Sequence, residues 1–339
     1  MGKVFCFGEL LLRMSPSLGG KWIQDSSIPV YIGGAELNVA MALARWNIPA
    51  KYFTALPDNY LSEEIKNELT TKGIDTSAIH FSGDRIGIYF LPQGTDLKNA
   101  AVIYDRAASS FAELKPGMVD WNEAFNNCSW FHWSAISPAL NENTAAVCKE
   151  AIEAAVANGL AISVDLNYRS KLWQYGKKPS QVMPDLVKYC DVIMGNIWAA
   201  EQLLGIRSPL KDSSEKTMEE LIDAAVQSMK AIHLTYPRVQ TMAYTFRLQK
   251  EYFGDLKNGN ELTVSEKLSL DNVVDKVGSG DCFMGGLIYG MYHNHQPQQI
   301  INFAASAAVG KMAEKGDATG QTIEIILQRV NKEWSEAKP

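Results

Sequence analysis

The chain has 339 residues, of which 46% are hydrophobic and 21% are charged, and its formal net charge is −6. This is the composition of an ordinary globular protein, long enough to bury a sizeable core without metals or disulfides. The negative charge argues against a general nucleic-acid binder, which normally has a basic face. It does not exclude an anionic small substrate held by a few arginines.

The cysteines and the apolar runs indicate the cell compartment of the protein. The five cysteines are scattered and contain no C-x-x-C pair, which is typical of reduced thiols and not of a disulfide framework or zinc site. The apolar stretch Val4–Phe7 is too short for a signal peptide, and the run Ile300–Gly310 is far shorter than the ~20 apolar residues of a membrane span. We therefore expect a cytoplasmic protein without a membrane partner.

Short apolar runs alternate with longer segments of helical periodicity along the first two thirds of the chain. We expect buried strands at Val4–Phe7, Tyr52–Ala55, Trp130–Trp133, Ala161–Asp165 and Val192–Met194. We expect helices at Leu37–Trp46, Ser62–Lys72, Glu142–Asn158 and Ser180–Tyr189. Alternation of this kind predicts βαβ units and an α/β fold with a mostly parallel sheet covered by helices.

Two stretches interrupt this alternation. Leu11–Tyr31 and Arg85–Tyr104 contain Gly and Pro and broken apolar patterns without a convincing helix. We expect them to form strands of a small separate sheet that covers one end of the main domain as a lid. The chain contains no repeat or flexible linker, so residues 1–339 are predicted to form one domain with this lid inserted.

In the last third of the chain we expect a helix, then a β-rich section, and then two more helices. A helix at Leu221–Met229 leads into a β-rich section, Ala231–Val264, with a hairpin turn at Gly254–Asn260. Two helices, Ser279–Tyr292 and Gln298–Ala313, then close the fold and are followed by a short amphipathic tail.

A glycine-rich turn, Gly278-Ser279-Gly280-Asp281, stands before the first of these two helices. The valines of Asn272–Val277 predict a strand or extended approach to it. Glycines at such a junction allow backbone N–H groups to converge, and the helix N-terminus adds positive potential. This arrangement can hold the charge that develops on a transferring phosphoryl group, while Asp281 accepts a proton from the attacking hydroxyl.

The same residues have simpler interpretations. Asp281 can be a mere cap of an ordinary strand-to-helix turn. The turn is neither a Walker loop, because no Gly-Lys-Ser/Thr follows, nor a G-x-G-x-x-G fingerprint after the first strand. Cys282 has no histidine nearby in the sequence and is interpreted as a small residue on the helix face.

The segment Asp275–Gly286 resembles the C-terminal signature of the ribokinase-like (PfkB) carbohydrate kinases, Asp-Thr-x-Gly-Ala-Gly-Asp. The resemblance implies a ribokinase-like three-layer sandwich with a β-sheet lid, ATP and Mg²⁺ as cofactors, and Asp281 as catalytic base. It further implies that Gly278, Ser279 and Gly280 form the anion hole. Lys276-Val277 departs from the signature, which leaves open a monovalent cation near Asp275.

A second glycine pair, Gly33-Gly34, opens the helix that contains Asn38. Paired glycines allow a ligand close to the backbone, and Asn38 offers both a donor and an acceptor. The alternative is a turn packed on the lid, with Asn38 satisfied internally. In the PfkB family this element lines the sugar site, and Gly8-Glu9 also fits the family pattern.

Three further segments look like parts of 2-keto-3-deoxygluconate kinases: Gly87–Phe90, Val102–Arg106 and Asp165–Trp173. The resemblance implies these substrate-binding residues: Gly33, Gly34, Asn38, Tyr89, Tyr104, Arg106, Asn167 and Arg169. Arginine binds a carboxylate through two parallel charge-assisted hydrogen bonds, which suits a sugar acid and which a neutral hexose would not need. The alternative is that Arg106 and Arg169 each form an ordinary surface ion pair.

The nucleotide side of the site follows the family less closely. Met194-Gly195-Asn196 resembles the family's Asn-x-x-Glu region, but the Glu position falls on Ala199, so no metal ligand is assigned. Asn196 can instead cap a helix at Ile197–Leu204. A strand at Ala231–Thr235 is expected before the adenine pocket, where the family's Gly-x-x-Gly is missing and Thr245-Phe246-Arg247 takes its place. The predicted nucleotide-binding residues are Asn196, Thr245, Gly278 and Gly280.

Three functions remain in competition at this point. The first is an ATP-dependent kinase that phosphorylates the terminal hydroxyl of 2-keto-3-deoxygluconate. The second is a fructokinase or related sugar kinase in which the two arginines are structural. The third is a catalytically weak ligand-binding member, which Ala199 would explain. The lid strands have edges that need a partner, so we expect a homodimer or higher homo-oligomer.

Overall fold

We analysed a computed structural model of the chain that describes residues 2–17, 22–24, 27–93 and 102–336, with side chains described up to residue 330. Parts of both predicted lid stretches, residues 18–21, 25–26 and 94–101, lie outside the described residues.

A ten-stranded sheet forms the centre of the molecule. In chain order its strands are β1 (Lys3–Phe7), β4 (Ala50–Phe53), β6 (Ile74–Asp75), β10 (Cys128–Ser134), β11 (Ala161–Asp165), β12 (Val192–Gly195), β13 (Thr241–Arg247), β14 (Glu251–Asn258), β15 (Glu261–Val264) and β16 (Leu268–Ser269). The spatial order is β15-β14-β13-β12-β11-β10-β1-β4-β6, with β16 beside β14. All neighbours from β6 to β13 are parallel, and β14 pairs antiparallel with β13, β15 and β16.

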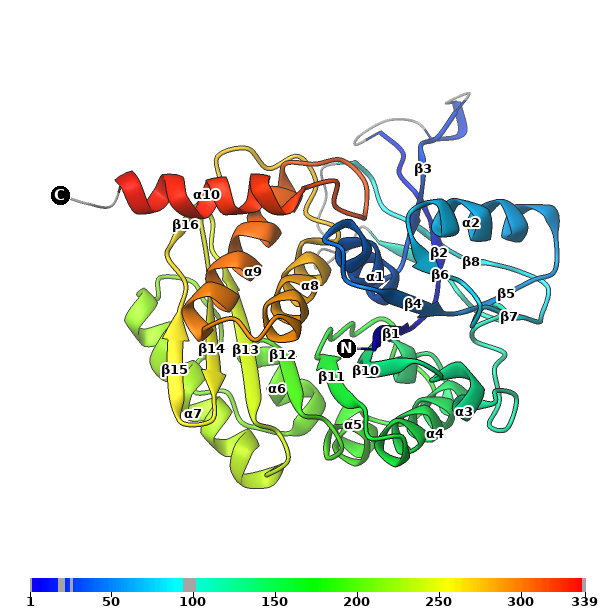
Figure 1. Ribbon diagram of the computed structural model, residues 1–339, viewed down its shortest axis with the longest axis horizontal. Helices are drawn as coiled ribbons and strands as arrows, with labels where there is room; N and C mark the ends of the chain where they lie inside the picture. Colours follow the sequence, from blue (N-terminus) through cyan, green and yellow to red (C-terminus); the bar gives the residue numbers. More distant parts are fainter. Residues whose placement is uncertain (1, 18–21, 25–26, 94–101, 337–339) are drawn as a thin grey trace.

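Helices cover both faces of this sheet (Figure 1). One face carries α1 (Ala35–Arg45), α2 (Tyr60–Thr71), α8 (Ser279–Tyr292), α9 (Pro297–Met312) and α10 (Ile323–Glu336). The other carries α3 (Trp121–Ala124), α4 (Glu142–Ala157), α5 (Pro179–Val187), α6 (Ile197–Leu204) and α7 (Met218–Thr235). Short 3-10 turns lie at Trp22–Gln24 and Ser137–Ala139. In the described ranges, no helix is long and apolar enough to cross a membrane.

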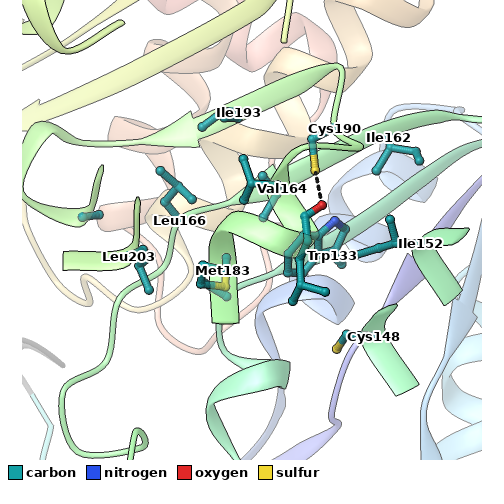
Figure 2. Close-up of a cluster of buried hydrophobic side chains, with 14 of the residues drawn as sticks. Trp133, Cys148, Ile152, Ile162, Val164, Leu166, Met183, Cys190, Ile193 and Leu203 are labelled. Carbon is teal, nitrogen blue, oxygen red and sulfur yellow. Dashed lines mark hydrogen bonds between the residues drawn. The ribbon is translucent and has the colours of Figure 1, made fainter. Parts of the chain in front are cut away.

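The strands are continuously apolar because both of their faces are buried. In β1, Val4 and Cys6 belong to the core on the α1 side, whereas Phe5 and Phe7 belong to the core on the α4 side. Figure 2 shows the second core around Trp133, which is 0% exposed and packs among side chains of α4, α5 and α6. Removing so large a buried side chain would cost about 3–5 kcal/mol, so this layer anchors the strand ends that carry the site.

A separate four-stranded sheet confirms the small sheet predicted from the two irregular stretches. It contains β2 (Leu11–Met14), β3 (Val30–Gly33), β8 (Gly87–Phe90) and β9 (Ile103–Asp105) in the order β3-β2-β8-β9. Strands β2 and β8 are parallel, and the outer pairs are antiparallel. A further pair, β5 (Ala55–Leu56) and β7 (His80–Phe81), lies apart from both sheets.

One local prediction was wrong, and two were right only in part. Ala231–Thr235 is the end of helix α7 and not a strand, because the buried Ser228 and Ile232 continue its 3.6-residue spacing. Asn272–Val277 forms turns without a strand, and Val273 and Val274 are 37% and 44% exposed. The hairpin turn predicted over Gly254–Asn260 is confined to Gly259 and Asn260, because β14 runs on to Asn258.

Candidate active site

A cavity of about 180 Å³ opens at the carboxyl ends of β11, β12 and β13. The first turns of α1 and α8 and the strands β8 and β9 of the small sheet complete its walls. Ligands of α/β proteins bind at this edge of a parallel sheet. The lining includes every predicted site residue except Gly33: Gly34, Asn38, Tyr89, Tyr104, Arg106, Asn167, Arg169, Asn196, Thr245, Gly278, Ser279, Gly280 and Asp281.

The turn before α8 has the conformation that its glycines permit. Gly278 is the N-cap and has φ 79°, and a β-carbon there would lie 1.9 Å from the backbone oxygen of Asp317. At Gly280 a β-carbon would meet nothing within 4 Å, so this position is open toward the cavity. The N–H groups of Gly280 and Asp281 are in the first helical turn, where no intrahelical carbonyl can accept them. The turn can therefore hold an anion at the positive end of α8.

Asp281 lies in the same turn and is 8% exposed. Its Oδ2 accepts a hydrogen bond from Nδ2 of Asn38 in α1, at 2.7 Å. Burial is the main reason that the pKa of Asp281 is raised to about 6, and the hydrogen bond from Asn38 and the charge of Arg169 oppose this rise. A carboxyl with a pKa this close to neutral is suited to accept and release protons.

Two more buried carboxyls surround Asp281. Glu36 in α1 is 2% exposed and accepts a hydrogen bond from the hydroxyl of Ser134. Burial raises its pKa to about 7, and the negative charge of Asp281 acts in the same direction. Burial and then the charge of Asp281 also raise the pKa of Asp165, at the end of β11. Clustered carboxyls with raised pKa values are typical of functional sites.

Arg106 follows β9 and forms a buried ion pair with Glu9. Its Nε and Nη2 lie 2.6 and 2.5 Å from Oε2 of Glu9, and the two residues are 6% and 3% exposed. Oε1 of Glu9 accepts the hydroxyl of Ser109 at 2.5 Å. The alternative of a surface ion pair is therefore wrong for Arg106, which is buried and lines the cavity.

Arg169 lies four residues after β11 and is half-buried. Its Nη1 donates to the backbone oxygen of Tyr168 at 3.1 Å. The charge of Arg169 lowers the pKa of Asp281 and of Asp165, so it faces the carboxyl groups of the cavity.

Arg13 in β2 joins the small sheet to the turn before α8. Its guanidinium forms two hydrogen bonds with Asp275, at 2.7 and 3.3 Å, and its Nε lies 2.8 Å from Oδ1 of Asp317. The other oxygen of Asp317 accepts the hydroxyl of Tyr89 at 2.9 Å. Arg13 is 2% exposed, and its plane lies over the ring of Tyr31. These contacts fix one wall of the cavity relative to α8.

The nucleotide side is less enclosed. Asn196 is half-buried and caps α6, because its Oδ1 accepts the N–H of Ala199 at 2.8 Å. The cap predicted as an alternative is thus confirmed, and Asn196 also lines the cavity. Thr245 and Arg247, at the end of β13, and Lys276 are half-buried lining residues.

Comparison with known proteins identifies the family. Residues 1–323 match the profile of the pfkB family of carbohydrate kinases. The chain belongs to this family. Its α/β fold with a small second sheet confirms the ribokinase-like architecture expected from the sequence.

This carbohydrate kinase is 32% identical to the 2-dehydro-3-deoxygluconokinase of Thermotoga maritima, whose crystal structure matches 97% of this chain and 98% of that chain with a TM-score of 0.87. It is 26% identical to the 2-dehydro-3-deoxygalactonokinase of Haloferax volcanii over 326 residues, 95% of each chain. A crystal structure of fructokinase with bound ATP from Xylella fastidiosa has the same fold, with a TM-score of 0.77, 18% identity and 98% and 99% coverage.

A second hollow of about 740 Å³ adjoins the site of the kinase. It shares Tyr104, Arg169 and Asn196 with the first cavity, and Lys171 and Trp198 lie farther along its wall. The two hollows therefore adjoin at these three residues. Among the described residues, no group of three or more His, Cys, Asp or Glu side chains is arranged to hold a metal ion.

Several residues of the cavity were not predicted: Leu11, Ala35, Ile136, Asp165, Met194, Gly195, Tyr252, Lys276, Val277 and Asp317. The position of Asp165 at the carboxyl end of a predicted strand was a usable signal. Asp317 lies in a loop without a motif, and no sequence signal indicated it. Gly33 does not line the cavity; a β-carbon there would lie 2.2 Å from Oδ2 of Asp317, so its role is close packing.

Proposed function

We propose that the protein transfers the γ-phosphoryl group of ATP to the terminal hydroxyl of 2-keto-3-deoxygluconate. The observation that carries this proposal is a buried carboxylate, Asp281, at the start of α8 in the same cavity as Arg106 and Arg169. A phosphoryl transfer needs a base beside an anion-binding turn, and a sugar acid needs a cation for its carboxylate.

In the proposed reaction the sugar hydroxyl oxygen forms a bond to the γ-phosphorus. The bond between this phosphorus and the bridging oxygen breaks, and ADP leaves with the electron pair. The hydroxyl proton passes to Asp281, and the N–H groups of the turn from Gly278 to Gly280 stabilise the charge on the phosphoryl oxygens. No covalent intermediate with the enzyme is required.

Asn38 is suited to orient the acceptor. Its Nδ2 is used by Asp281, whereas its buried Oδ1 has no hydrogen-bond partner among the described residues. A buried acceptor without a partner is costly, and a substrate hydroxyl would satisfy it. We propose that Asn38, together with Gly34, Tyr89, Tyr104 and Asn167, binds the sugar chain.

The open space at Gly280 and the free N–H groups of the first helical turn fit the phosphate end of ATP. We propose that Asn196 and Thr245 also contact the nucleotide. Mg²⁺ would be carried on the phosphate oxygens, since it usually keeps several waters and few protein ligands. The monovalent cation that the sequence left open near Asp275 is given no role in this reaction.

A fructokinase or other sugar kinase remains the second candidate, and one observation favours it. The charge of Arg106 is already neutralised by Glu9 inside the protein, so Arg169 is the one of the two arginines without an ion pair among the described residues. The site therefore favours an acid over a neutral sugar less strongly than the two arginines in the sequence indicate.

A substrate panel tests these alternatives. The protein is incubated with Mg-ATP and 2-keto-3-deoxygluconate, its galactonate epimer, fructose, ribose and adenosine, and ADP release is measured. We expect the highest kcat/KM for a keto-deoxy sugar acid. Preferential turnover of fructose, ribose or adenosine would contradict the acid-specific proposal, and binding without any turnover would favour a ligand-binding member.

We further propose that residues 1–339 form one domain, with the small sheet as its lid. We propose that the protein is cytoplasmic and forms a homodimer or higher homo-oligomer through this small sheet. The outer strands β3 and β9 expose Val30 and Ile103, which are 50% and 54% accessible. Exposed apolar edge strands are unfavourable unless another chain covers them. Light scattering after size exclusion tests this, and a monomeric mass would contradict it.

A further inference from the structure

Lys311 is a buried lysine that the proposed reaction does not use. It lies in the last turn of α9 and is 0% exposed. Among the described residues, its Nζ makes one hydrogen bond, to the backbone oxygen of Glu314 at 3.4 Å. Burial lowers the pKa of Lys311, because the ammonium loses its hydration. One long hydrogen bond does not offset that loss, so nearby charges must stabilise the ammonium.

The side chain of Lys311 runs behind the anion-binding turn. A β-carbon on Gly278 would lie 3.4 Å from Cε of Lys311. Gly278 lines the cavity and Lys311 does not, so the lysine lies behind the turn as seen from the cavity. No described residue of α9 lines the cavity.

Three carboxylates lie near enough to act on this ammonium. Asp275 precedes the turn, and Glu314 and Asp317 follow α9; their charges raise the pKa of Lys311 against the effect of burial. In the other direction, the charge of Lys311 lowers the pKa of Asp281 and of Asp317. The lysine is thus coupled both to the catalytic carboxylate and to the loop that holds Gly278.

A fixed positive charge at this place has a clear use. In a water-excluded site, an oriented charge acts on a developing anion far more strongly than it would in water. The turn itself is held in place by Asp275, whose oxygens bind Arg13 and the N–H groups of Val277 and Gly316. Beside Arg13, Arg169 and the lining residues Arg247 and Lys276, Lys311 is a further cation that balances Asp275, Asp317, Asp281 and the incoming phosphates.

We infer that Lys311 is an internal cation that supports the anion-binding turn from behind, so that turnover does not depend on a free monovalent cation. This inference rests on the proposed phosphoryl transfer and deepens it. Lys311 acts through the turn from Gly278 to Asp281 and is a positioning residue, since it does not touch the cavity.

Chemical rescue of a deleted charge tests the inference. Lys311→Ala removes the ammonium and leaves space, whereas Lys311→Met removes the charge but fills most of that space. We expect both variants to lose about 100-fold in kcat with little change in the KM of the acceptor, because the lost charge acts on the transition state. Ammonium or K⁺ should restore turnover of Lys311→Ala and leave Lys311→Met unchanged.

The matched control is Lys315→Met, which removes the same charge from an exposed position four residues farther along the chain, just after α9. It should keep the turnover of the unmodified protein. Normal kcat in Lys311→Met would overturn the inference. Equal inactivity of both Lys311 variants without rescue would also overturn it, because turnover would then depend on packing and not on charge.

The unmodified protein provides a test that needs no folded variant. Replacing K⁺ and Na⁺ by tetramethylammonium at constant ionic strength should leave turnover unchanged, and a strong loss would overturn the inference. Absence of turnover with every acceptor would contradict the proposed function instead. If another acceptor of the panel is phosphorylated, the variants are compared on that acceptor, since Lys311 concerns the phosphoryl group and not the sugar.

Discussion

The two sides of the cavity are built differently. We call the part around the small sheet the acceptor side, and its charged residues are Glu9, Arg13, Arg106 and Asp317, all less than 10% exposed and joined in ion pairs. We call the part at the ends of β12 and β13 the nucleotide side, and its polar residues are Asn196, Thr245, Arg247 and Lys276, all half-buried. The first side is preorganised by buried charge, whereas the second is open to solvent.

The difference has a physical consequence for substitutions. A buried ion pair cannot lose one partner without leaving the other charge in a low dielectric, so changes on the acceptor side affect stability as well as binding. A half-buried polar group can be replaced by water, so changes on the nucleotide side affect mainly the affinity for ATP. Asp281 lies between the two sides and is the proposed base.

The largest effect is expected at Asp281. Asp281→Asn removes the base while keeping the size of the side chain, and we expect kcat to fall by about 10²–10⁴-fold. The affinity for ATP, measured by calorimetry, should change little, because the N–H groups of the turn remain. Turnover near that of the unmodified protein would exclude Asp281 as the base.

The next largest effect separates the two arginines. Arg106→Met leaves Glu9 buried without its partner, which should lower the free energy of unfolding by about 3–5 kcal/mol. Arg169→Met breaks no ion pair among the described residues, so it should cost little stability. It should lower kcat/KM for a sugar acid about 10- to 100-fold, the value of a charge-assisted hydrogen bond. Urea unfolding and kinetics measure the two quantities.

The double variant Arg106→Met/Glu9→Gln is the control for this comparison. It removes the unpaired negative charge of Glu9 and should recover most of the lost stability. If Arg106→Met alone is as stable as the unmodified protein, the acceptor side is not held by its ion pairs, and the contrast between the two sides disappears.

Much of the fold could be predicted because burial leaves a periodic pattern. Ala161–Asp165 and Ser279–Tyr292 were predicted with the bounds that the structure has. The strand prediction at Ala231–Thr235 failed because a short run of this composition fits a strand as well as a helix end. Val273 and Val274 were misleading because β-branched residues in an exposed turn look like a strand in sequence.

The site residues could be predicted from the sequence where the chemistry requires a particular residue at a particular spacing. Gly278 must adopt a positive φ and Asp281 must stand in the first helical turn, so four consecutive residues carry the signal. The pairing of Arg13 with Asp275 joins positions 262 residues apart, and no local pattern can predict it. The same holds for Asp317 and Lys311, whose roles depend on how a loop returns to the start of α8.

Two glycines of the turn provide a paired test of intermediate size. Gly278→Ala places a β-carbon 1.9 Å from the backbone oxygen of Asp317 at a φ of 79°. It should lower the free energy of unfolding by at least about 1–2 kcal/mol from the left-handed conformation alone. Gly280→Ala fills open space, so stability should remain while the KM for ATP rises. Equal losses of stability in both variants would contradict the open space at Gly280.

The pH dependence tests the surroundings of Asp281. Its pKa is raised to about 6, and only the ionised form accepts a proton, so kcat/KM should rise with pH through about 6 and then level. The hydrogen bond from Asn38 lowers this pKa, as do the charges of Arg169 and Lys311, whereas the charge of Asp317 raises it. Asn38→Ala should therefore move the rise to higher pH.

A second carboxyl, Glu36, can contribute to the same pH profile, and its contribution must be distinguished from that of Asp281. Burial raises the pKa of Glu36 to about 7, so it also titrates near neutrality. Glu36→Gln should keep a rise of kcat/KM near pH 6 if Asp281 is the group that the profile reports. Loss of the rise in Glu36→Gln would assign it to Glu36.

The smallest effect is expected on the nucleotide side, at Lys276. This lysine is half-buried beside the turn, and its charge can attract phosphates but is screened by solvent. Lys276→Met should raise the KM for ATP about two- to fivefold, as expected for an exposed charge pair. The effect should fade at high salt, and neither the melting temperature nor the KM of the acceptor should change. A drop in the melting temperature as large as that of Arg106→Met would show that buried charge organises both sides of the cavity alike.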